Sequence, residues 1–405
     1  MHAKSLETAN GGCKISARAY AFRAALFLAA TFFAIGIYLP FFPVWLKAQG
    51  LSDGAISATV ALPVLVRALI VGVLAAGADR FGELRIGAML YAAAATAVFL
   101  ALSLAEGSLA ILLVSSVALI FWHALIPLGD AVALQGVVRH GIDYGRTRLW
   151  GSVAFIGGNF AAGAAIAVFS VDAVYGLQLA AFFAGIGAAA LLPAVGPAAF
   201  VGRGRGVFNL PRDRRLILAI VAASFGTASH GAYYAFGSLY WRSLGFSDLT
   251  IAALWALGVV VEVGLFFLAH RFVSWGARRF LIAGTLGALL RWSLFAFVTF
   301  APLVFALQAL HALTFAATHL GMMKAIGAVA ANGHTARLQG FYQLVAGLVL
   351  GAGMLAAGGL YTIAPQAAFA LMALLGLIGL GLAWQLPRGL QPQSPAGGGS
   401  TSVPT

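Results

Sequence analysis

The sequence predicts an all-α membrane protein with twelve transmembrane helices, arranged as two pseudo-symmetric six-helix bundles. Of the 405 residues, 62% are hydrophobic and only 9% are charged, whereas soluble domains carry roughly 25% charged residues. Apolar runs of about 20 residues, the length that crosses a bilayer as a helix, recur along the whole chain. The runs do not alternate with a period of two, so they predict helices rather than barrel strands.

Each half of the chain contains six apolar segments. The predicted spans in the first half are residues 21–45, 52–78, 85–104, 108–138, 144–170 and 172–192. Those in the second half are 216–241, 247–272, 279–300, 301–331, 336–360 and 364–386. The Gly-, Pro- and Arg-rich stretch 193–215 predicts a linker between a bundle at 21–192 and a bundle at 216–387. Residues 1–20 and the low-complexity stretch 388–405 are expected to be tails, the second one disordered.

The basic residues predict the orientation in the membrane. Twenty of the 24 lysines and arginines lie in one set of alternate loops, and the opposite set holds only Lys47 and Arg242. Positively charged loops stay in the cytoplasm. We therefore expect a multi-pass protein of the bacterial inner membrane with the termini and the linker 193–215 all cytoplasmic. The net charge of +13 follows from this topology, so a nucleic-acid partner is not expected.

The two halves repeat one pattern. Matching features occur in the same order in both halves. Tyr38 and Trp45 of the first half correspond to Tyr234 and Trp241 of the second, Ser52-Asp53 corresponds to Ser247-Asp248, and Arg67 corresponds to Glu262. Gly347 and Gly351 have the GxxxG spacing that allows membrane helices to approach closely. Two related bundles around a central site are the architecture of many secondary transporters.

Charges inside membrane helices are costly, so each one requires a reason. Glu262 lies 14 residues beyond Asp248, about 21 Å along a helix and near the middle of the membrane. A buried carboxylate can carry one proton, although it can also form a fixed ion pair that holds two helices together. Arg67 lies at the equivalent depth of the first half, where it either binds a substrate carboxylate or pairs permanently with an acid.

Other residues have two interpretations each. Asp130 and Arg148, towards the cytoplasmic ends of their helices, suit either a gate salt bridge or a ligand site. His311 and His319 suit either function or helix packing. Tyr38, Tyr233 and Tyr234 suit either contacts with a flat ring or carboxylate, or packing. Asp79 and Arg80, in a cytoplasmic hairpin, suit either gating or a static turn.

Several strings carry a family resemblance. Asp79-Arg80-Phe81-Gly82, with Gly72 and Gly77 upstream, is similar to the loop between the second and third helices of the major facilitator superfamily. Its counterpart in the second half has His270 in place of the acid. Longer strings resemble the bacterial 3-phenylpropionate transporter group, namely YLPFFPVWLK from Tyr38, DYGRTRLWGS from Asp143, GAYYAFGSLYW from Gly231 and WALGVVVEV from Trp255. This resemblance covers nearly the whole chain.

The chain resembles the lactose permease group more distantly. That resemblance implies a ligand-binding role for Arg148 and Asp130, and a proton-coupling role for Glu262, Arg291 and His311. One position departs from the pattern, because Thr314 stands where that group carries its proton-releasing glutamate. Glu262 or Asp130 would then have to take the proton.

These observations predict a secondary active transporter, a proton symporter that imports a small aromatic carboxylate by alternating access. Proton coupling is assigned to Glu262, Asp130 and His311. Substrate binding is assigned to Arg67, Arg148, Arg291, Tyr38, Tyr233, Tyr234 and His319, and gating to Asp79 and Arg80. A sugar or nucleoside symporter is the alternative, followed by an exporter or a non-transporting membrane protein. No enzyme signature is present, so an enzyme, a metal and a cofactor are not expected. The expected partners are the substrate, the proton and the bilayer, with the protein as a monomer.

Overall fold

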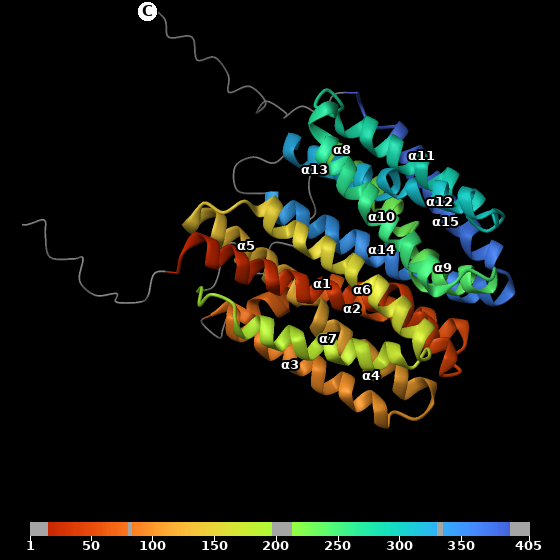
Figure 1. Cartoon of the computed structure of the whole chain (residues 1–405). Coiled ribbons are helices and arrows are strands. Elements are labelled where there is room, and N and C mark those ends of the chain that lie inside the picture. Colours follow the sequence, from red (N-terminus) through yellow and green to blue (C-terminus); the bar gives the residue numbers. More distant parts are fainter. Residues whose placement is uncertain (1–14, 80–82, 197–212, 330–334, 389–405) are drawn as a thin grey trace, which may run out of the picture.

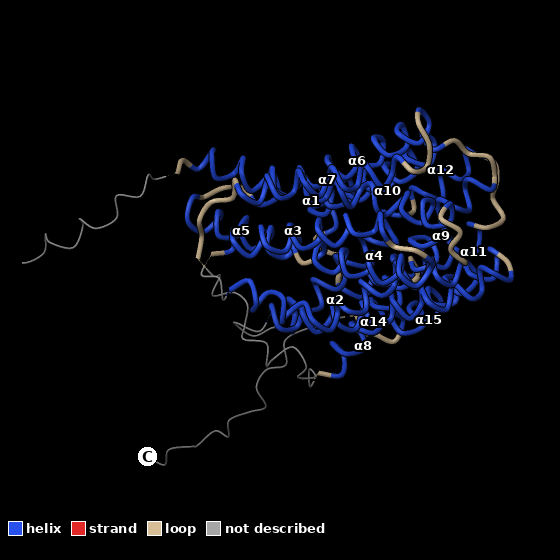
Figure 2. The backbone as a smooth tube through the Cα atoms, turned by 90° about the horizontal axis from the view of Figure 1, so that it is seen from below, coloured by secondary structure: helices blue, strands red, loops and turns tan. Residues whose placement is uncertain are grey.

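The computed structural model describes residues 15–79, 83–196, 213–329 and 335–388, although the side chains of residues 71–79 and 336 are outside that description. All regular elements in this part are helices, and the loops lie at the two ends of the bundle (Figure 2). Helices coloured red to yellow-green form one half and those coloured green to blue form the other (Figure 1). The predicted fold, two six-helix bundles, is confirmed.

The first half contains seven α-helices and one short 3₁₀ turn. They are α1 (Ala17–Ala48), α2 (Asp53–Asp79), α3 (Leu84–Leu100), η1 (Ala101–Leu104), α4 (Gly107–His123), α5 (Leu125–His140), α6 (Tyr144–Val168) and α7 (Ala173–Ala190). The fourth predicted segment, 108–138, is thus divided into α4 and α5. The other segments of this half form continuous helices near their predicted positions.

The second half contains eight α-helices and two shorter helical turns. They are α8 (Arg214–Ala228), α9 (Gly231–Ser243), α10 (Asp248–Leu268), η2 (Ala269–Phe272), α11 (Ala277–Phe295), α12 (Ala301–Ala309), the π-helical turn η3 (Ala312–Ala317), α13 (Thr318–Val329), α14 (Thr335–Ile363) and α15 (Pro365–Trp384). The seventh and tenth predicted segments, 216–241 and 301–331, are divided here.

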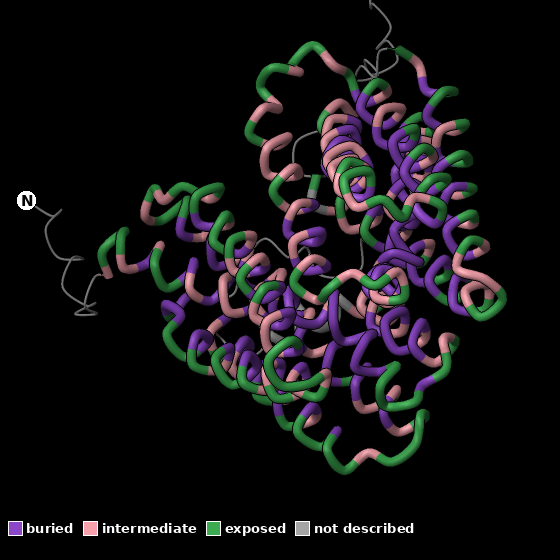
Figure 3. Tube along the Cα trace, turned by 45° about the vertical axis from the view of Figure 1, so that its right-hand side comes forward, coloured by how far each residue is buried: buried purple, intermediate pink, exposed green. Residues whose placement is uncertain are grey.

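In the described part of the chain, eleven helical spans are long and apolar enough to cross a membrane. The ninth predicted segment, 279–300, is the one outside these eleven; it forms α11, which has 19 residues but contains Arg278, Arg279 and Arg291. Large apolar side chains face outward from the spans, and some recur every four residues, as Leu286, Leu290 and Leu294 do on α11. Buried residues lie between packed helices and exposed ones on the outer surfaces and at the ends (Figure 3). Lipid is the solvent that suits such a surface.

Each of the three divided segments is interrupted beside a histidine. His123 ends α4, His230 lies between α8 and α9, and His311 lies between α12 and η3. The side chains at the first two breaks hydrogen bond to carbonyls of the preceding turn: His123 Nδ1 to Leu119 O (2.7 Å) and His230 Nδ1 to Thr227 O (3.1 Å). At the second break the side chain adds a second donor to the Thr227 carbonyl, which also accepts from the His230 backbone N–H at 3.2 Å. Sequence periodicity missed the breaks because the segments remain apolar throughout.

The predicted internal repeat reappears as two matching turns. Gly50 (φ 81°) and Gly245 (φ 84°) adopt the left-handed conformation that favours glycine. After each turn an aspartate pairs with the basic residue six positions before it, Lys47 with Asp53 (2.7 Å) and Arg242 with Asp248 (3.1 Å). Below, this end of the molecule is called the opposite face. The end where α1 begins and α15 ends, which carries Arg139, Arg146 and Arg278, is called the arginine-rich face.

The two halves meet through a crossed pairing of equivalent helices. The second helix of each half packs against the fifth helix of the other, α2 against α14 and α10 against α6, while α1 packs on α9. Gly347 and Gly351 lie at the first contact, where an added Cβ would press on Ala68 and Leu65. At the second contact, a Cβ on Gly163 would come within 2.8 Å of Asp248 O, near the opposite face. The predicted GxxxG spacing therefore lies at an interface between the halves.

Two glycines allow the backbones of α1 and α6 to touch within the first half. A Cβ on Gly36 would clash with Phe155 O, and a Cβ on Gly158 would clash with Phe33 O. Both obstacles are backbone atoms, which cannot rotate away as a side chain can. The close approach also brings Arg148 on α6 over α1, where its guanidinium lies 4.0 Å from the centre of the Phe32 ring.

We expect Gly158→Ala to destabilise the protein by about 1–3 kcal/mol, because the new methyl group overpacks the contact between α1 and α6. The measurement is the thermal unfolding midpoint of the purified protein in detergent. Gly157→Ala is the matched control, because the nearest atom to its Cβ is 3.9 Å away, in the Phe33 ring. A Gly158→Ala midpoint equal to that of Gly157→Ala would contradict the close backbone contact.

Candidate functional site

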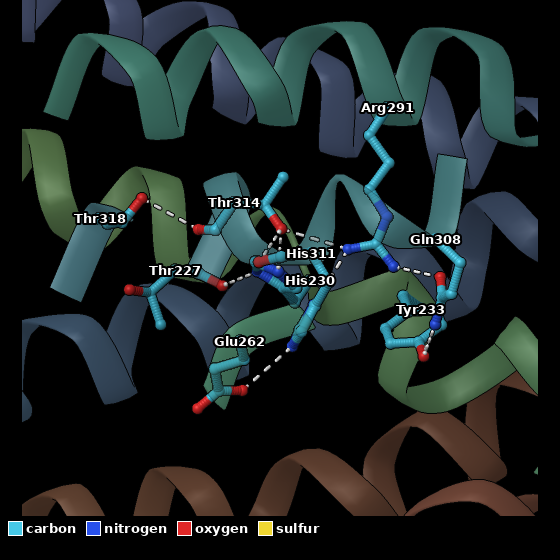
Figure 4. Close-up of polar contacts among 9 residues, drawn as sticks. All are labelled: Thr227, His230, Tyr233, Glu262, Arg291, Gln308, His311, Thr314 and Thr318. Carbon is cyan, nitrogen blue, oxygen red and sulfur yellow. Dashed lines mark hydrogen bonds and ion pairs between the residues drawn. The ribbon is translucent and has the colours of Figure 1, made fainter. Parts of the chain in front are cut away.

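A buried polar cluster lies inside the second half, where the breaks at His230 and His311 face each other. We call it the Arg291 cluster; it consists of Arg291, His311, Gln308, Thr314, His230, Tyr233 and Glu262 (Figure 4). Its members come from α9, α10, α11, α12, η3 and the two breaks. The predicted residues Arg291, His311, Glu262 and Tyr233 are therefore brought together.

Arg291 is fully buried, with no exposed surface. Its guanidinium donates hydrogen bonds to His311 Nδ1 (3.1 Å), Thr314 Oγ1 (3.2 Å) and Gln308 Oε1. It also lies 4.3 Å from the centre of the Trp292 ring and 5.0 Å from that of Tyr233. In the described part of the chain, no carboxylate lies within ion-pair distance of it. The positive charge is therefore surrounded by neutral dipoles and aromatic faces.

These contacts determine which ring nitrogen of His311 carries the proton. A guanidinium can only donate, so Nδ1 of His311 must accept from Arg291. The neutral imidazole then carries its hydrogen on Nε2, which lies 3.6 Å from Glu262 Oε2. Gly258, one turn before Glu262 on α10, makes room for the ring, because a Cβ there would come within 3.3 Å of His311 Cδ2. The single N–H of the neutral His311 ring therefore points at the Glu262 carboxyl group.

His230 has the other tautomer. Its Nδ1 lies 3.1 Å from the carbonyl oxygen of Thr227, which can only accept. Nε2 then accepts from Thr314 Oγ1 at 3.0 Å. The hydroxyl of Thr314 thus accepts from Arg291 and donates to His230. Thr314, which stands where related symporters are expected to carry an acid, links the cation to a neutral histidine.

Glu262 lies at the edge of the cluster, with 22% of its side chain exposed. It is within electrostatic reach of His319 on α13 and of Arg148 on α6 of the other half. Tyr234, partly exposed beside His230 with ring centres 5.6 Å apart, also lies near this carboxyl group. Glu262 is the member of the cluster that can respond to groups from both halves.

A second polar group lies in the first half. Arg148 Nε is 3.4 Å from Asp130 Oδ1, and the Tyr144 hydroxyl donates to the same oxygen at 3.1 Å. Asp130 and Arg148 are about one-third exposed, at 31% and 29% of their side chains. This geometry contains the predicted ion pair, and it is compatible with both a gate contact and a ligand site.

The remaining predicted residues are placed separately. Arg67 is partly buried on α2, and in the described part of the chain it has no acid within ion-pair distance. Tyr38 is buried, with its ring edge-on to His123 at 5.9 Å. Tyr233 is buried too: it stacks on Trp255 at 4.2 Å and accepts a hydrogen bond from Gln308 at 2.6 Å. Arg80 lies outside the described residues, as does the side chain of Asp79, so the gating prediction stays a prediction.

Sequence reasoning missed several residues that complete these groups. Gln308 bridges Arg291 and Tyr233, Thr227 orients His230, and Tyr144 supports Asp130. Gln308 carried a usable signal, because it is a polar residue three positions before His311 in an apolar segment. Thr227 acts through its backbone carbonyl, so its side-chain type gave no signal.

Comparisons with known proteins agree with this fold. Residues 22–371 match the MFS_1-like family. The chain is 32% identical over 361 residues to the probable 3-phenylpropionic acid transporter of Escherichia coli K12, covering 85% of this chain and 92% of that protein. A shorter match, 33% over 132 residues, covers 32% of this chain and 33% of the maltose permease of Geobacillus stearothermophilus.

Solved structures share the fold at low sequence identity. The nucleoside transporter NupG superposes with a TM-score of 0.78 at 14% identity, covering 91% of this chain and 98% of that one. A bacterial homologue of the human lysosomal transporter Spinster gives 0.68 at 13% identity, covering 92% and 97%. The resemblance inferred from sequence strings is confirmed. The chain is a membrane-embedded member of the MFS_1-like family, whose members move small molecules and are transporters, not enzymes.

Proposed function

We propose that this protein is a proton symporter of the bacterial inner membrane that imports a small aromatic carboxylate. The observation that carries the proposal is the environment of Glu262. It is a partly exposed carboxyl group inside the membrane, held by a histidine whose other nitrogen is occupied by a buried arginine. Because its side chain is partly exposed, such a group can exchange a proton with its surroundings. The excess of basic residues at the arginine-rich face supports a cytoplasmic location for that face and for both termini.

The charges within the membrane spans favour an anionic substrate. Arg67 lies well inside α2 and Arg291 well inside α11, whereas the acid at a comparable depth, Glu262, lies on α10 beside His311. Arg148 is paired with Asp130. Arg67 has no comparable acid among the described residues, so a substrate carboxylate would supply its missing counter-ion. The relative that is a probable 3-phenylpropionic acid transporter supports the same substrate class.

Aromatic side chains suit the other end of such a substrate. Tyr234 is partly exposed and lies beside Trp255, with ring centres 6.3 Å apart and nearly parallel. A flat ring could stack on this surface with an offset geometry. The carboxylate would then lie towards the first half and the ring towards the second. In this arrangement, one substrate molecule contacts both bundles and can couple their movement.

A sugar or nucleoside symporter is the second candidate. Asp130, Tyr144 and Arg148 form a partly exposed group of donors and acceptors that could bind hydroxyl groups. The partial match to a maltose permease is consistent with this interpretation. The substrate comparison below separates the two candidates, because a neutral polyol does not need the charge of Arg67.

We expect Glu262→Gln to lower proton-driven accumulation of 3-phenylpropionate by about tenfold or more while exchange across the membrane continues, because glutamine cannot carry the proton. The measurement is uptake of the labelled acid into proteoliposomes with an imposed pH gradient, with and without an uncoupler. Glu106→Gln, an exposed acid at the opposite face, is the control. Normal uphill uptake by Glu262→Gln would show that Glu262 is structural.

We expect Arg67→Gln to raise the KM for 3-phenylpropionate by about tenfold or more, because the bidentate partner of the carboxylate is lost, and Arg67→Lys to raise it less. The uncharged 3-phenylpropionamide serves as the comparison substrate. Its binding should change little. Arg139→Gln, an exposed arginine at the arginine-rich face, is the matched control. Equal losses for acid and amide would contradict a direct contact between Arg67 and the carboxylate.

A further inference from the structure

The Arg291 cluster limits where the proton of Glu262 can go. This inference rests on the proposed function, in which Glu262 carries the transported proton. His311 is the imidazole in contact with Glu262, but neither of its nitrogens is free to accept. Nδ1 already accepts from Arg291, and Nε2 already carries hydrogen. If His311 were protonated, its Nδ1–H and the Arg291 N–H would both be donors facing each other, and two positive charges would repel in a buried site.

His230 is occupied in a similar way. Its Nδ1 donates to Thr227 O and its Nε2 accepts from Thr314 Oγ1, which in turn accepts from Arg291. His230 has no exposed surface. The two histidines that a sequence pattern would nominate as relays are therefore kept neutral by the same arginine.

His319 differs from both. It is partly exposed on α13, and within the described part of the chain neither of its ring nitrogens has a hydrogen-bonding partner. Its ring packs edge-on against Phe266 at 5.9 Å. Phe266 follows Glu262 by four residues on α10, so the two lie on one face, one turn apart. His319 therefore lies within electrostatic reach of Glu262, though beyond ion-pair distance, and one turn nearer to the arginine-rich face.

We propose that His319, and not His311, accepts the proton from Glu262 and passes it towards the arginine-rich face. The O–H bond of the Glu262 carboxylic acid breaks, the proton passes through one intervening water, and an N–H bond forms on the neutral imidazole, which leaves a carboxylate and an imidazolium. The imidazolium then loses this proton to water. His311 stays neutral and donates to the carboxylate that remains, so it positions Glu262 for the next cycle.

The other groups around Glu262 are compatible with this route. The titratable or charged side chains near it are His311, His319, Arg148 from the first half and Tyr234. Arg148 is a permanent cation and Tyr234 is a phenol that does not accept a proton from a carboxylic acid. Of these four, His319 alone has a free basic nitrogen.

The first test follows the histidines directly by solid-state nitrogen NMR of histidine-labelled protein in lipid, with His311→Asn and His319→Gln used for assignment. As the pH falls from about 8 to about 5, we expect His319 to change from imidazole to imidazolium and His311 to keep its hydrogen on Nε2 throughout. Glu262→Gln should displace the His319 transition, because it removes the neighbouring charge. Formation of an imidazolium at His311 within this range, or a neutral His319 throughout it, would overturn the proposal.

The second test separates proton transfer from substrate binding. We expect His319→Gln to lower accumulation of 3-phenylpropionate driven by an imposed pH gradient by about tenfold or more, and to make the remaining uptake insensitive to an uncoupler, because glutamine cannot carry the proton. His270→Gln, an exposed histidine at the arginine-rich face, is the control. Normal accumulation by His319→Gln would overturn the relay. If wild type accumulates no phenylpropionate, the proposed function fails, and the NMR titration still decides between His319 and His311.

Discussion

The burial of Arg291 without an acid partner is the constraint on which the rest of the site depends. A lone charge in apolar surroundings is expensive unless every polar atom finds a partner. Here the guanidinium uses an imidazole, a hydroxyl and an amide, supported by the faces of two aromatic rings. These bonds occupy the two terminal nitrogens of Arg291 and leave its buried Nε without a partner; they orient His311 and, through Thr314, His230. The site has one fixed charge, two neutral histidines and one acid that can change its charge.

The broken helices provide the places where this chemistry can occur. An uninterrupted membrane helix satisfies its own backbone and leaves little reason for polar side chains to gather. The breaks after α8 and around η3 instead bring His230 and His311 together, with ring centres 5.4 Å apart. The matching break in the first half carries His123. Discontinuous helices near the middle of the membrane are a recurrent feature of transporter binding sites.

The two halves share a plan but divide the chemistry unequally. Their turns at the opposite face match in glycine conformation and in ion pair. At the depth of Glu262, however, the first half carries Arg67. One half therefore supplies a proton site and the other a cation at equivalent depth. Because α6 packs against α10, Arg148 of the first half is also within electrostatic reach of Glu262. A change of charge at Glu262 can thus alter the electrostatic interaction with Arg148 across the interface between the halves.

The sequence by itself determined that lipid surrounds the protein, how many helices it has, that its two halves repeat one pattern, and which family it belongs to. Apolar runs of membrane length, basic residues in alternate loops and paired motifs are local properties, readable without knowing which helices touch. It also singled out Glu262, Arg291 and His311. Only the tertiary structure decided how these residues interact, because the guanidinium that assigns the hydrogen of His311 comes from a separate helix, α11. Gln308 accepts from Arg291 across 17 positions, and Thr314 meets His230 across 84. Hydrogen-bond direction between such distant residues depends on packing, which no run of sequence encodes locally.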